Sequence, residues 1–131
     1  MEKSIVLKDF GKLIGIELDF DENNQCLLNV CGNVWISIYH TENNYVLYGM
    51  LGDFPEQEQS EFWKSVLSVN KDLLDLEEGS ICLEESTDSL LLIKSIPTNA
   101  LDAFVFKEKF EKFAATMERL INFLADNQNG F

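Results

Sequence analysis

The sequence predicts an α+β fold in which a twisted antiparallel sheet packs with helices in the order α-β-β-β-α-β-β-α. Apolar residues recur at helical spacing near both ends and in the middle of the chain, and the stretches between them read as short strands bounded by turn residues. The 131 residues, 46% of them hydrophobic, suffice for one real core but not two. We therefore expect one domain spanning residues 1–131.

Charge and cysteine content exclude several classes of function. Ten basic and twenty-three acidic residues give a net charge of −13, which opposes binding to nucleic acid and to anionic membranes. The N-terminal residues contain neither an uninterrupted apolar run nor a signal-peptide cleavage site. Three cysteines, an odd number with no C-x-x-C pair, favour a reducing compartment. The expectation is a soluble cytoplasmic protein without membrane insertion.

Residues 4–16 contain the first predicted helix, because Ile5, Val6, Phe10, Leu13 and Ile14 recur at helical spacing, and we expect it to stop near Gly15. Gly11 inside it allows close packing on a neighbour. A polar bend with the spacing D-x-D-x-N follows at residues 19–23 and resembles the start of a calcium loop. The positions that such a loop reserves for glycine and glutamate hold Asn24 and Val30, so a solvated turn is preferred.

Three strands are predicted at residues 25–30, 34–39 and 45–51, joined by turn-forming segments. If each turn is a two-residue hairpin loop, facing residues have numbers of opposite parity and the strands divide into two faces. One face is aromatic and contains Leu28, Val30, Trp35, Ser37, Tyr39, Val46, Tyr48 and Met50. The other is aliphatic and contains Leu27, Asn29, Val34, Ile36, Ile38, Leu47, Gly49 and Leu51. A bulge would change this assignment.

The aliphatic face suits a core under helices, and the aromatic face has the chemistry of a surface that meets partners. Burial of both faces by the protein's own helices is the alternative. A second helix is predicted from about residue 56 to residue 76, with apolar residues over more of its circumference than one stripe. Its second apolar side is covered either by another subunit or by the rest of the same chain.

A hairpin at residues 81–84 and 90–95 follows, and its second strand is nearly continuous in apolar residues. Pro97 stops the sheet, and Thr98 and Asn99 are the predicted cap of a long last helix. Its apolar positions keep helical spacing from Leu101 to Leu124.

The sequence offers no catalytic, cofactor-binding or metal-binding site. His40 is the single histidine and lies beside a turn, and there is no nucleophile elbow, phosphate loop or zinc motif. The carboxylates are scattered over turns and helix ends. A small ligand-binding or enzymatic α/β domain, with a pocket between the sheet and the C-terminal helix, remains the alternative function.

Several segments together resemble the class I type III secretion chaperones, the small acidic bacterial proteins of the Tir chaperone family. The segments are LIGIELDFDENNQCLL, V-W-I-S-I, Y-G-M-L, VLSVN and GSICLEESTDSLLLI, and they span nearly the whole chain. The likeness is greatest to the members that serve a single effector. None of the segments is a catalytic motif, so the resemblance rests on order, size and charge.

The resemblance implies a homodimer without enzymatic activity that binds the N-terminal segment of a secreted effector in extended form and keeps it soluble and secretion-competent. It also suggests the secretion ATPase as a further partner. The expected effector-binding residues, on the first helix and the sheet, are Phe10, Leu13, Ile14, Leu28, Val30, Trp35, Tyr39, Tyr48 and Met50. The expected dimer interface, on the second helix, contains Phe62, Trp63, Val66, Leu67, Asn70 and Leu73.

Overall fold

The computed structural model describes residues 4–53 and 60–129 and confirms the predicted element order. The helices are α1 (Ser4–Ile14), α2 (Ser60–Asp75) and α3 (Ala103–Asn129). The strands are β1 (Gln25–Cys31), β2 (Val34–His40), β3 (Asn44–Asp53), β4 (Ser80–Glu84) and β5 (Ser89–Pro97). The predicted start of the second helix, at residues 56–59, lies outside the described residues.

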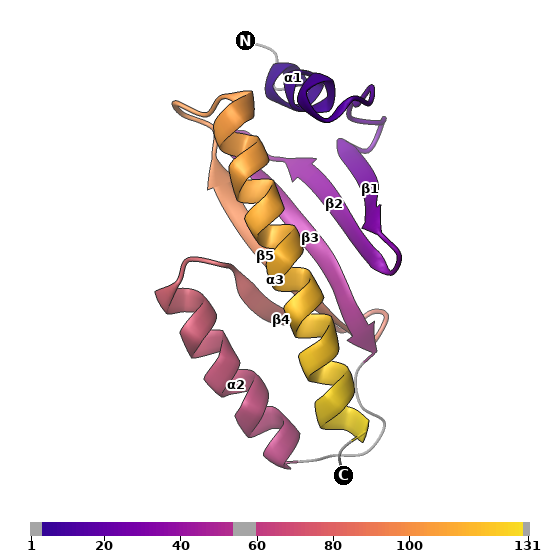
Figure 1. Cartoon of the computed structure of the whole chain (residues 1–131), viewed down its shortest axis with the longest axis vertical. Helices are drawn as coiled ribbons and strands as arrows, with labels where there is room; N and C mark the ends of the chain where they lie inside the picture. Colours follow the sequence, from indigo (N-terminus) through magenta and orange to yellow (C-terminus); the bar gives the residue numbers. More distant parts are fainter. Residues whose placement is uncertain (1–3, 54–59, 130–131) are drawn as a thin grey trace.

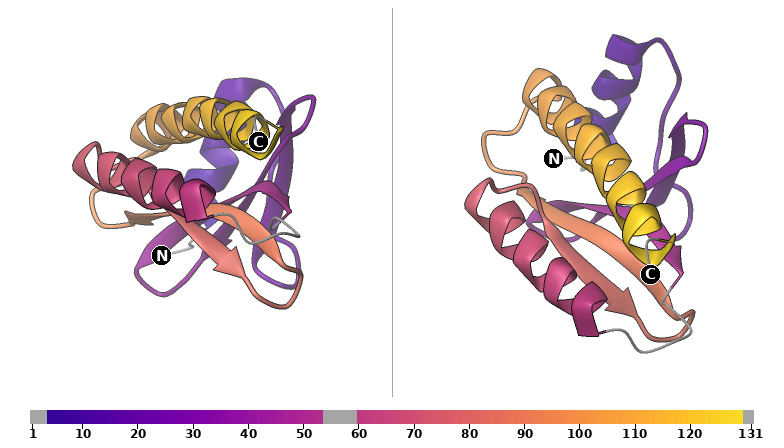
Figure 2. Two further views of the ribbon diagram at one scale, coloured as in Figure 1. Left: turned by 90° about the horizontal axis from the view of Figure 1, so that it is seen from below. Right: turned by 60° about the horizontal axis from the view of Figure 1, so that its bottom comes forward.

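The strands form one antiparallel sheet in the order β1-β2-β3-β5-β4. All three helices lie on the same face of this sheet, with α3 running across it, α1 beside the N-terminal half of α3, and α2 beside β4 (Figures 1 and 2). We call the helix-covered face the inner face and the opposite one the outer face. The prediction of a sheet packed with helices is thus confirmed, with every helix on one side.

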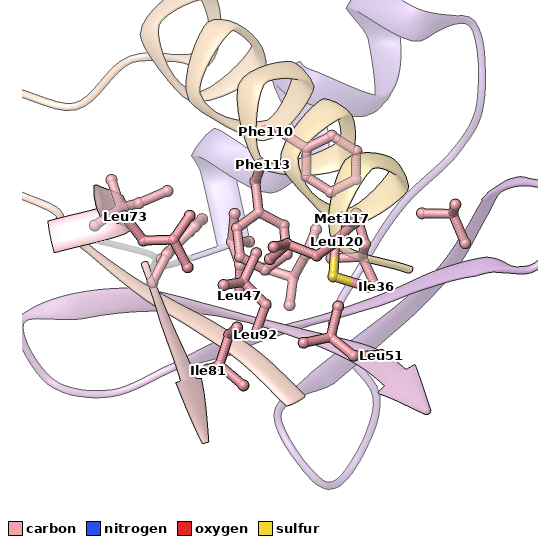
Figure 3. Close-up of a cluster of buried hydrophobic side chains, with 14 of the residues drawn as sticks. Ile36, Leu47, Leu51, Leu73, Ile81, Leu92, Phe110, Phe113, Met117 and Leu120 are labelled. Atoms are coloured by element: carbon pink, nitrogen blue, oxygen red, sulfur yellow. The ribbon is translucent and has the colours of Figure 1, made fainter. Parts of the chain in front are cut away.

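The core fills the space between the inner face and the helices. Ile36 of β2 and Leu92 of β5 both pair with Gly49 of β3, and their side chains are fully buried together with that of Leu47. Phe113 and Met117 reach them from α3 (Figure 3). Gly49 lies directly beneath α3, because a Cβ atom there would overlap the end of the Met117 side chain. A side chain at this position would force the flexible end of Met117 to move.

The ends of the helices follow local chemistry. α1 ends at Ile14, in agreement with the predicted stop near Gly15, and Gly15 has a φ of 82°. The predicted cap of the last helix at Thr98 and Asn99 is wrong. Asp102 caps α3 instead, since its Oδ1 atom accepts a hydrogen bond of 2.8 Å from the backbone N–H of Val105.

The acidic bend before β1 is a turn exposed to solvent, as predicted. Its Asp21 carboxylate accepts hydrogen bonds of 2.8 and 3.0 Å from the backbone N–H groups of Asn23 and Gln25. Asn24 adopts a φ of 60°, a conformation that asparagine tolerates well. The carboxylate thus serves the backbone of its own turn.

A bulge in β1 corrects the predicted division into faces. Cys31 pairs with Val34 as the parity argument requires, but Asn29 pairs with Trp35, so the register shifts at Val30. From there to Gln25, residues of β1 and β2 that face each other have numbers of the same parity. Leu28 therefore pairs with Ile36 on the inner face, and Leu27 pairs with Ser37 on the outer face. The predicted faces of β2 and β3 are confirmed, and those of Leu27 and Leu28 were exchanged.

Candidate functional site

The outer face of the sheet carries a hollow, which we call the aromatic cup. It has a volume of about 480 Å³ and is lined by Leu27, Trp35, Ser37, Tyr48, Met50 and Leu91. Leu27, Trp35 and Met50 are each about half exposed, at 56%, 48% and 47%. Large apolar side chains that are gathered in a hollow and left half open to water are typical of a surface that binds another polypeptide.

Neighbouring side chains hold the cup in shape. The rings of Tyr39 and Tyr48 meet edge to face with centroids 5.1 Å apart. The Tyr39 hydroxyl donates a hydrogen bond of 2.9 Å to Gln25 Oε1, and Gln25 Nε2 donates one of 3.2 Å to Ser37 Oγ. Tyr39 therefore supports the wall of the cup without lining it. Such support lowers the cost of ordering the surface when a partner binds.

A second hollow, the α1–β1 groove, opens at the opposite side of β1. It has a volume of about 230 Å³ and is lined by Phe10, Ile14, Ile16, Leu28, Asn29, Val30, Phe110 and Glu111. Its floor is rigid because the Phe10 ring packs against Phe106 and Phe110 with centroid distances of 5.0 and 5.1 Å. Ile14, Ile16 and Val30 form an apolar rim and are 40%, 47% and 41% exposed.

β1 separates the two hollows and is the edge strand of the sheet as far as the structure describes it. Leu27 contributes to the cup, whereas Leu28 and Val30 contribute to the groove. The edge of β1 opposite β2 pairs with no described strand, so its backbone is open to an added strand between the two hollows.

The predicted effector-binding residues thus divide into two groups. Trp35, Tyr48 and Met50 line the cup, and Phe10, Ile14, Leu28 and Val30 line the groove. Leu13 is exposed on α1 but lines neither hollow. Sequence reasoning missed Leu27 and Leu91 in the cup, and Ile16 and Phe110 in the groove. The bulge hid Leu27, whereas Leu91 and Phe110 come from β5 and α3, which the parity argument did not include.

The residues predicted for a dimer interface also fall into two groups, one held inside this chain and one nearer to solvent. Phe62, Val66 and Leu73 are buried inside this chain, at 0%, 4% and 4% exposure. The Asn70 side chain joins α2 to β4, because it donates a hydrogen bond of 3.1 Å to the Ile81 carbonyl and accepts one of 2.6 Å from the Ile81 N–H.

The other two residues of that set lie nearer to solvent. Trp63 is partly buried against Phe62, with ring centroids 5.0 Å apart, and Leu67 is 67% exposed. Among the apolar residues of α2, Leu74 and Leu67, at 71% and 67% exposure, are the most accessible to another subunit.

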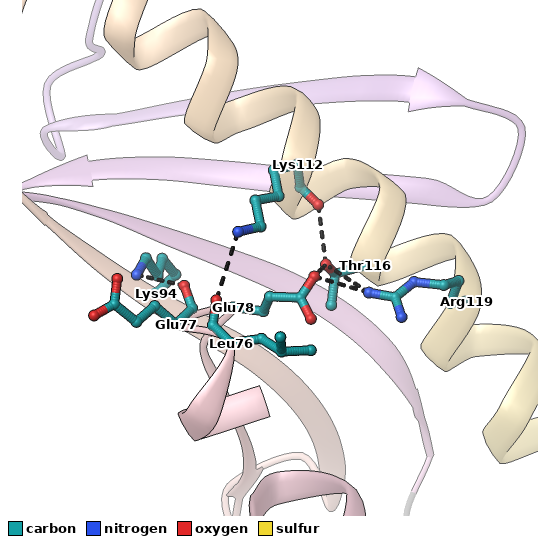
Figure 4. A network of polar contacts seen from close by, with 7 residues as sticks. All are labelled: Leu76, Glu77, Glu78, Lys94, Lys112, Thr116 and Arg119. Carbon is teal, nitrogen blue, oxygen red and sulfur yellow. Dashed lines mark hydrogen bonds and ion pairs between the residues drawn. The ribbon is translucent and has the colours of Figure 1, made fainter. Parts of the chain in front are cut away.

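A polar network closes the junction of α2, β4 and α3 (Figure 4). The carboxylate of Glu78, only 8% exposed, accepts hydrogen bonds of 2.9 Å from both Thr116 Oγ1 and Arg119. Lys94 Nζ donates one of 2.7 Å to the Glu77 carbonyl. These contacts join the end of α2 to the sheet and to α3.

Burial is the main cause of the shifted pKa values in this molecule. It raises the pKa of the Cys26 and Cys82 thiols, which keeps both protonated and unreactive near neutral pH. It also raises the pKa of Tyr45 to about 12. In residues 4–53 and 60–126 no cluster of three histidine, cysteine, aspartate or glutamate side chains is arranged to hold a metal ion.

No helix in the described part of the chain is both long enough and apolar enough to cross a bilayer.

The chain matches a family model and several solved structures. The model of the Tir chaperone protein (CesT) family matches residues 6–121. The fold is similar to that of a chain in the HopA1–SchA chaperone–effector complex, with a TM-score of 0.76 and 18% identity over 89% of this chain and 91% of that one.

Two further likenesses are of the same kind. A chain of the ExsC–ExsE complex gives a TM-score of 0.74 and 16% identity over 91% of this chain and 90% of that one. A chain of the heterodimeric ExoU–SpcU complex, from the type III secretion system of Pseudomonas aeruginosa, gives a TM-score of 0.71 and 14% identity over 88% of this chain and 95% of that one. At these identities the structural likeness establishes the fold.

Proposed function

The chain belongs to the Tir chaperone protein (CesT) family, and from this membership we propose that it is a non-enzymatic chaperone for a type III secreted effector. It binds the N-terminal segment of that effector, called the client segment below, in extended form and keeps it soluble and ready for secretion. Two of the similar structures support this proposal: HopA1–SchA is a chaperone–effector complex, and ExoU–SpcU is a complex from a type III secretion system.

The aromatic cup is the observation that supports this function most directly. A half-exposed tryptophan, methionine and leucine in one hollow bury apolar surface only when a partner covers them. The α1–β1 groove supplies a second apolar hollow, and the open edge of β1 lies between the two. A client segment in extended form can place apolar side chains in both hollows while its backbone follows the edge.

The alternative of a small ligand-binding or enzymatic domain needs a pocket between the sheet and α3. Over the middle of α3 that space is filled, since Met117 is fully buried against Gly49 and Phe113 is 2% exposed. The chaperone function needs no such pocket, because its surfaces lie on the outside of the molecule.

The chaperone acts as a homodimer in the bacterial cytoplasm, where it meets its client before secretion. Leu67 and Trp63 on α2 form the proposed contact between the two copies, while Phe62, Val66 and Leu73 support them from inside each subunit. Asn70 keeps α2 in place through its hydrogen bonds to Ile81. The secretion ATPase is a further proposed partner, and the acidic surface is suited to basic segments.

The test is capture of the client by the purified protein. The chain and its Trp35→Glu variant are each co-expressed with the secreted proteins of the source bacterium, and bound proteins are identified by mass spectrometry. The parent should retain one secreted protein through its N-terminal region, and the variant should lose it. Phe104→Glu is the matched control, because Phe104 is 72% exposed on α3 and lines neither hollow. Failure of the parent to retain any secreted protein would contradict the proposed function.

A further inference from the structure

The sheet has a second open backbone edge, at the C-terminal end of β5. β4 begins at Ser80, which pairs with Ile93, whereas β5 continues to Pro97 and remains paired with β3 to its end. From Lys94 to Ile96, β5 therefore has a described strand on one side only. Such an edge offers backbone N–H and C=O groups to an added strand.

A hollow of about 500 Å³ lies beside this edge, and we call it the lysine notch. The last turns of α2 form one wall through Leu73 and Leu74, and Lys109 of α3 forms another. Neither the aromatic cup nor the α1–β1 groove shares a lining residue with it. The notch is accordingly a separate surface with its own chemistry.

Three of the ten basic residues of this acidic chain gather around the notch. Lys94 and Lys109 line it, and Lys112 lies on α3 one turn beyond Lys109. The pKa of Lys94 is lowered mainly by burial and further by the nearby charges of Lys109 and Lys112, while Glu77 acts against the shift. The local sign of charge is thus opposite to that of the whole molecule.

The three ammonium groups differ in what they already bind. Lys94 donates to the Glu77 carbonyl, and Lys112 donates a long hydrogen bond of 3.5 Å to the Leu76 carbonyl. Lys109 makes no hydrogen bond or ion pair with any residue that the structure describes. It is therefore the lysine most available to a partner.

Nearby acids weaken this positive charge without cancelling it. Glu77 lines the notch, and Glu78 is already paired with Arg119 and Thr116. Charges that lie farther from the notch than the Debye length, which is about 8 Å at physiological salt, are largely screened. Charge close to the notch therefore decides which partner it attracts.

We propose that the lysine notch is a docking site for a short extended segment of another protein that carries an acidic side chain. The backbone of the segment pairs with Lys94–Ile96 and continues the line of β4, and its carboxylate meets Lys109. Pro97 has no N–H to offer and ends the pairing, so the contact spans about three residues, or roughly 10 Å. Leu73 and Leu74 receive an apolar side chain of the same segment.

A second copy of this chain is a poor occupant. Two copies related by a two-fold axis through the notch would bring the same lysines face to face. Like charges at close range oppose association, whereas a segment of opposite charge is attracted. The proposal does not depend on the client or on either apolar hollow.

The test is an NMR titration of the full chain labelled with ¹⁵N. The probe is a capped octapeptide in which valine and glutamate alternate, and its counterpart has lysine in place of glutamate. The acidic peptide should shift the amide signals of residues 94–96 and of Leu73 and Leu74, and the lysine peptide should not. Shifts confined to other residues, equal shifts by both peptides, or no shifts at millimolar peptide would overturn the proposal.

Charge variants make the test specific. Lys109→Glu should weaken binding of the acidic peptide roughly fivefold or more, as expected for loss of one ion pair and addition of a like charge. Lys64→Glu is the matched control, since it makes the same change of net charge at the far end of α2, where Lys64 is 75% exposed. Equal weakening by both variants would overturn the proposal in favour of general charge repulsion. Shifts at residues 94–96 that change with protein concentration in the absence of peptide would overturn it in favour of self-association.

Discussion

Replacing Trp35 with alanine should weaken binding of the client segment by roughly 30- to 70-fold. Trp35 is 48% exposed in the aromatic cup, so about 100 Å² of a side chain of roughly 200–250 Å² is left for a partner to cover. At about 25 cal/mol per Å² this area corresponds to ~2.5 kcal/mol, and the remaining Cβ atom and relaxation of the cup lower the figure to ~2 kcal/mol. Because the lost energy is apolar, the ratio of the two affinities should hardly change with salt.

Tryptophan fluorescence provides the assay, since the chain has two tryptophans and Trp63→Phe leaves Trp35 as the only one. In that background, titration with the client segment should shift the emission of Trp35 to shorter wavelength as water leaves the cup. Calorimetry then gives the affinities of the parent, Trp35→Ala and the control Phe104→Ala. The reasoning is refuted if Trp35→Ala binds as tightly as the parent, or if its emission does not respond when a client known to be bound is added.

Three further predictions concern association, packing and pH. Leu67→Glu should convert a homodimer into a folded monomer, because Leu67 is 67% exposed within one chain and a charge there does not disturb the core. Light scattering that finds the parent already monomeric would contradict the α2 contact. Gly49→Ala should lower the free energy of unfolding by about 1–2 kcal/mol in urea denaturation, since the new methyl group meets Met117. When Gly49→Ala and Met117→Ala are combined, the loss of stability should be smaller than the sum of the losses in the two single variants. Burial of Tyr45 raises its pKa from 10.0 to about 12, so the contribution of its neutral hydroxyl to stability is complete below pH 10 and is lost as pH rises toward 12. Absorbance at alkaline pH should show one tyrosine of three titrating last, and Tyr45→Phe should remove that step.

Strong periodic patterns made most of the fold predictable from sequence. All eight elements were expected in the correct order, because each has a local signature of spacing or turn residues. The pairing of β2 with β3 also followed from parity, since four residues separate His40 from its partner Tyr45 and leave the alternation intact. The helix cap was less accessible: Thr98, Asn99 and Asp102 are all good capping residues, and the choice depends on where β5 ends.

The site was predictable in part, and its errors have a physical cause. Trp35, Tyr48 and Met50 were identified because they stand out as large apolar residues on one face of predicted strands. The predicted faces of Leu27 and Leu28 were exchanged because one unpaired residue, Val30, shifts the register of β1. The sequence around Val30 contains no pattern that predicts a bulge. Leu91 and the lysine notch depend on long-range pairing of β5, which no local pattern contains.

The bulge at Val30 determines which side chains of β1 the two hollows present. If Val30 paired with Trp35 instead of bulging, regular alternation would turn Leu27 toward the helices and Leu28 toward solvent, so both walls would change composition in a single event. A substitution elsewhere in β1 changes one contact at a time, whereas loss of the bulge exchanges an entire row of side chains. A bulge at the edge of the sheet is therefore a route by which a protein of this fold could acquire a different binding preference while its core, built on β2, β3 and β5, stays the same.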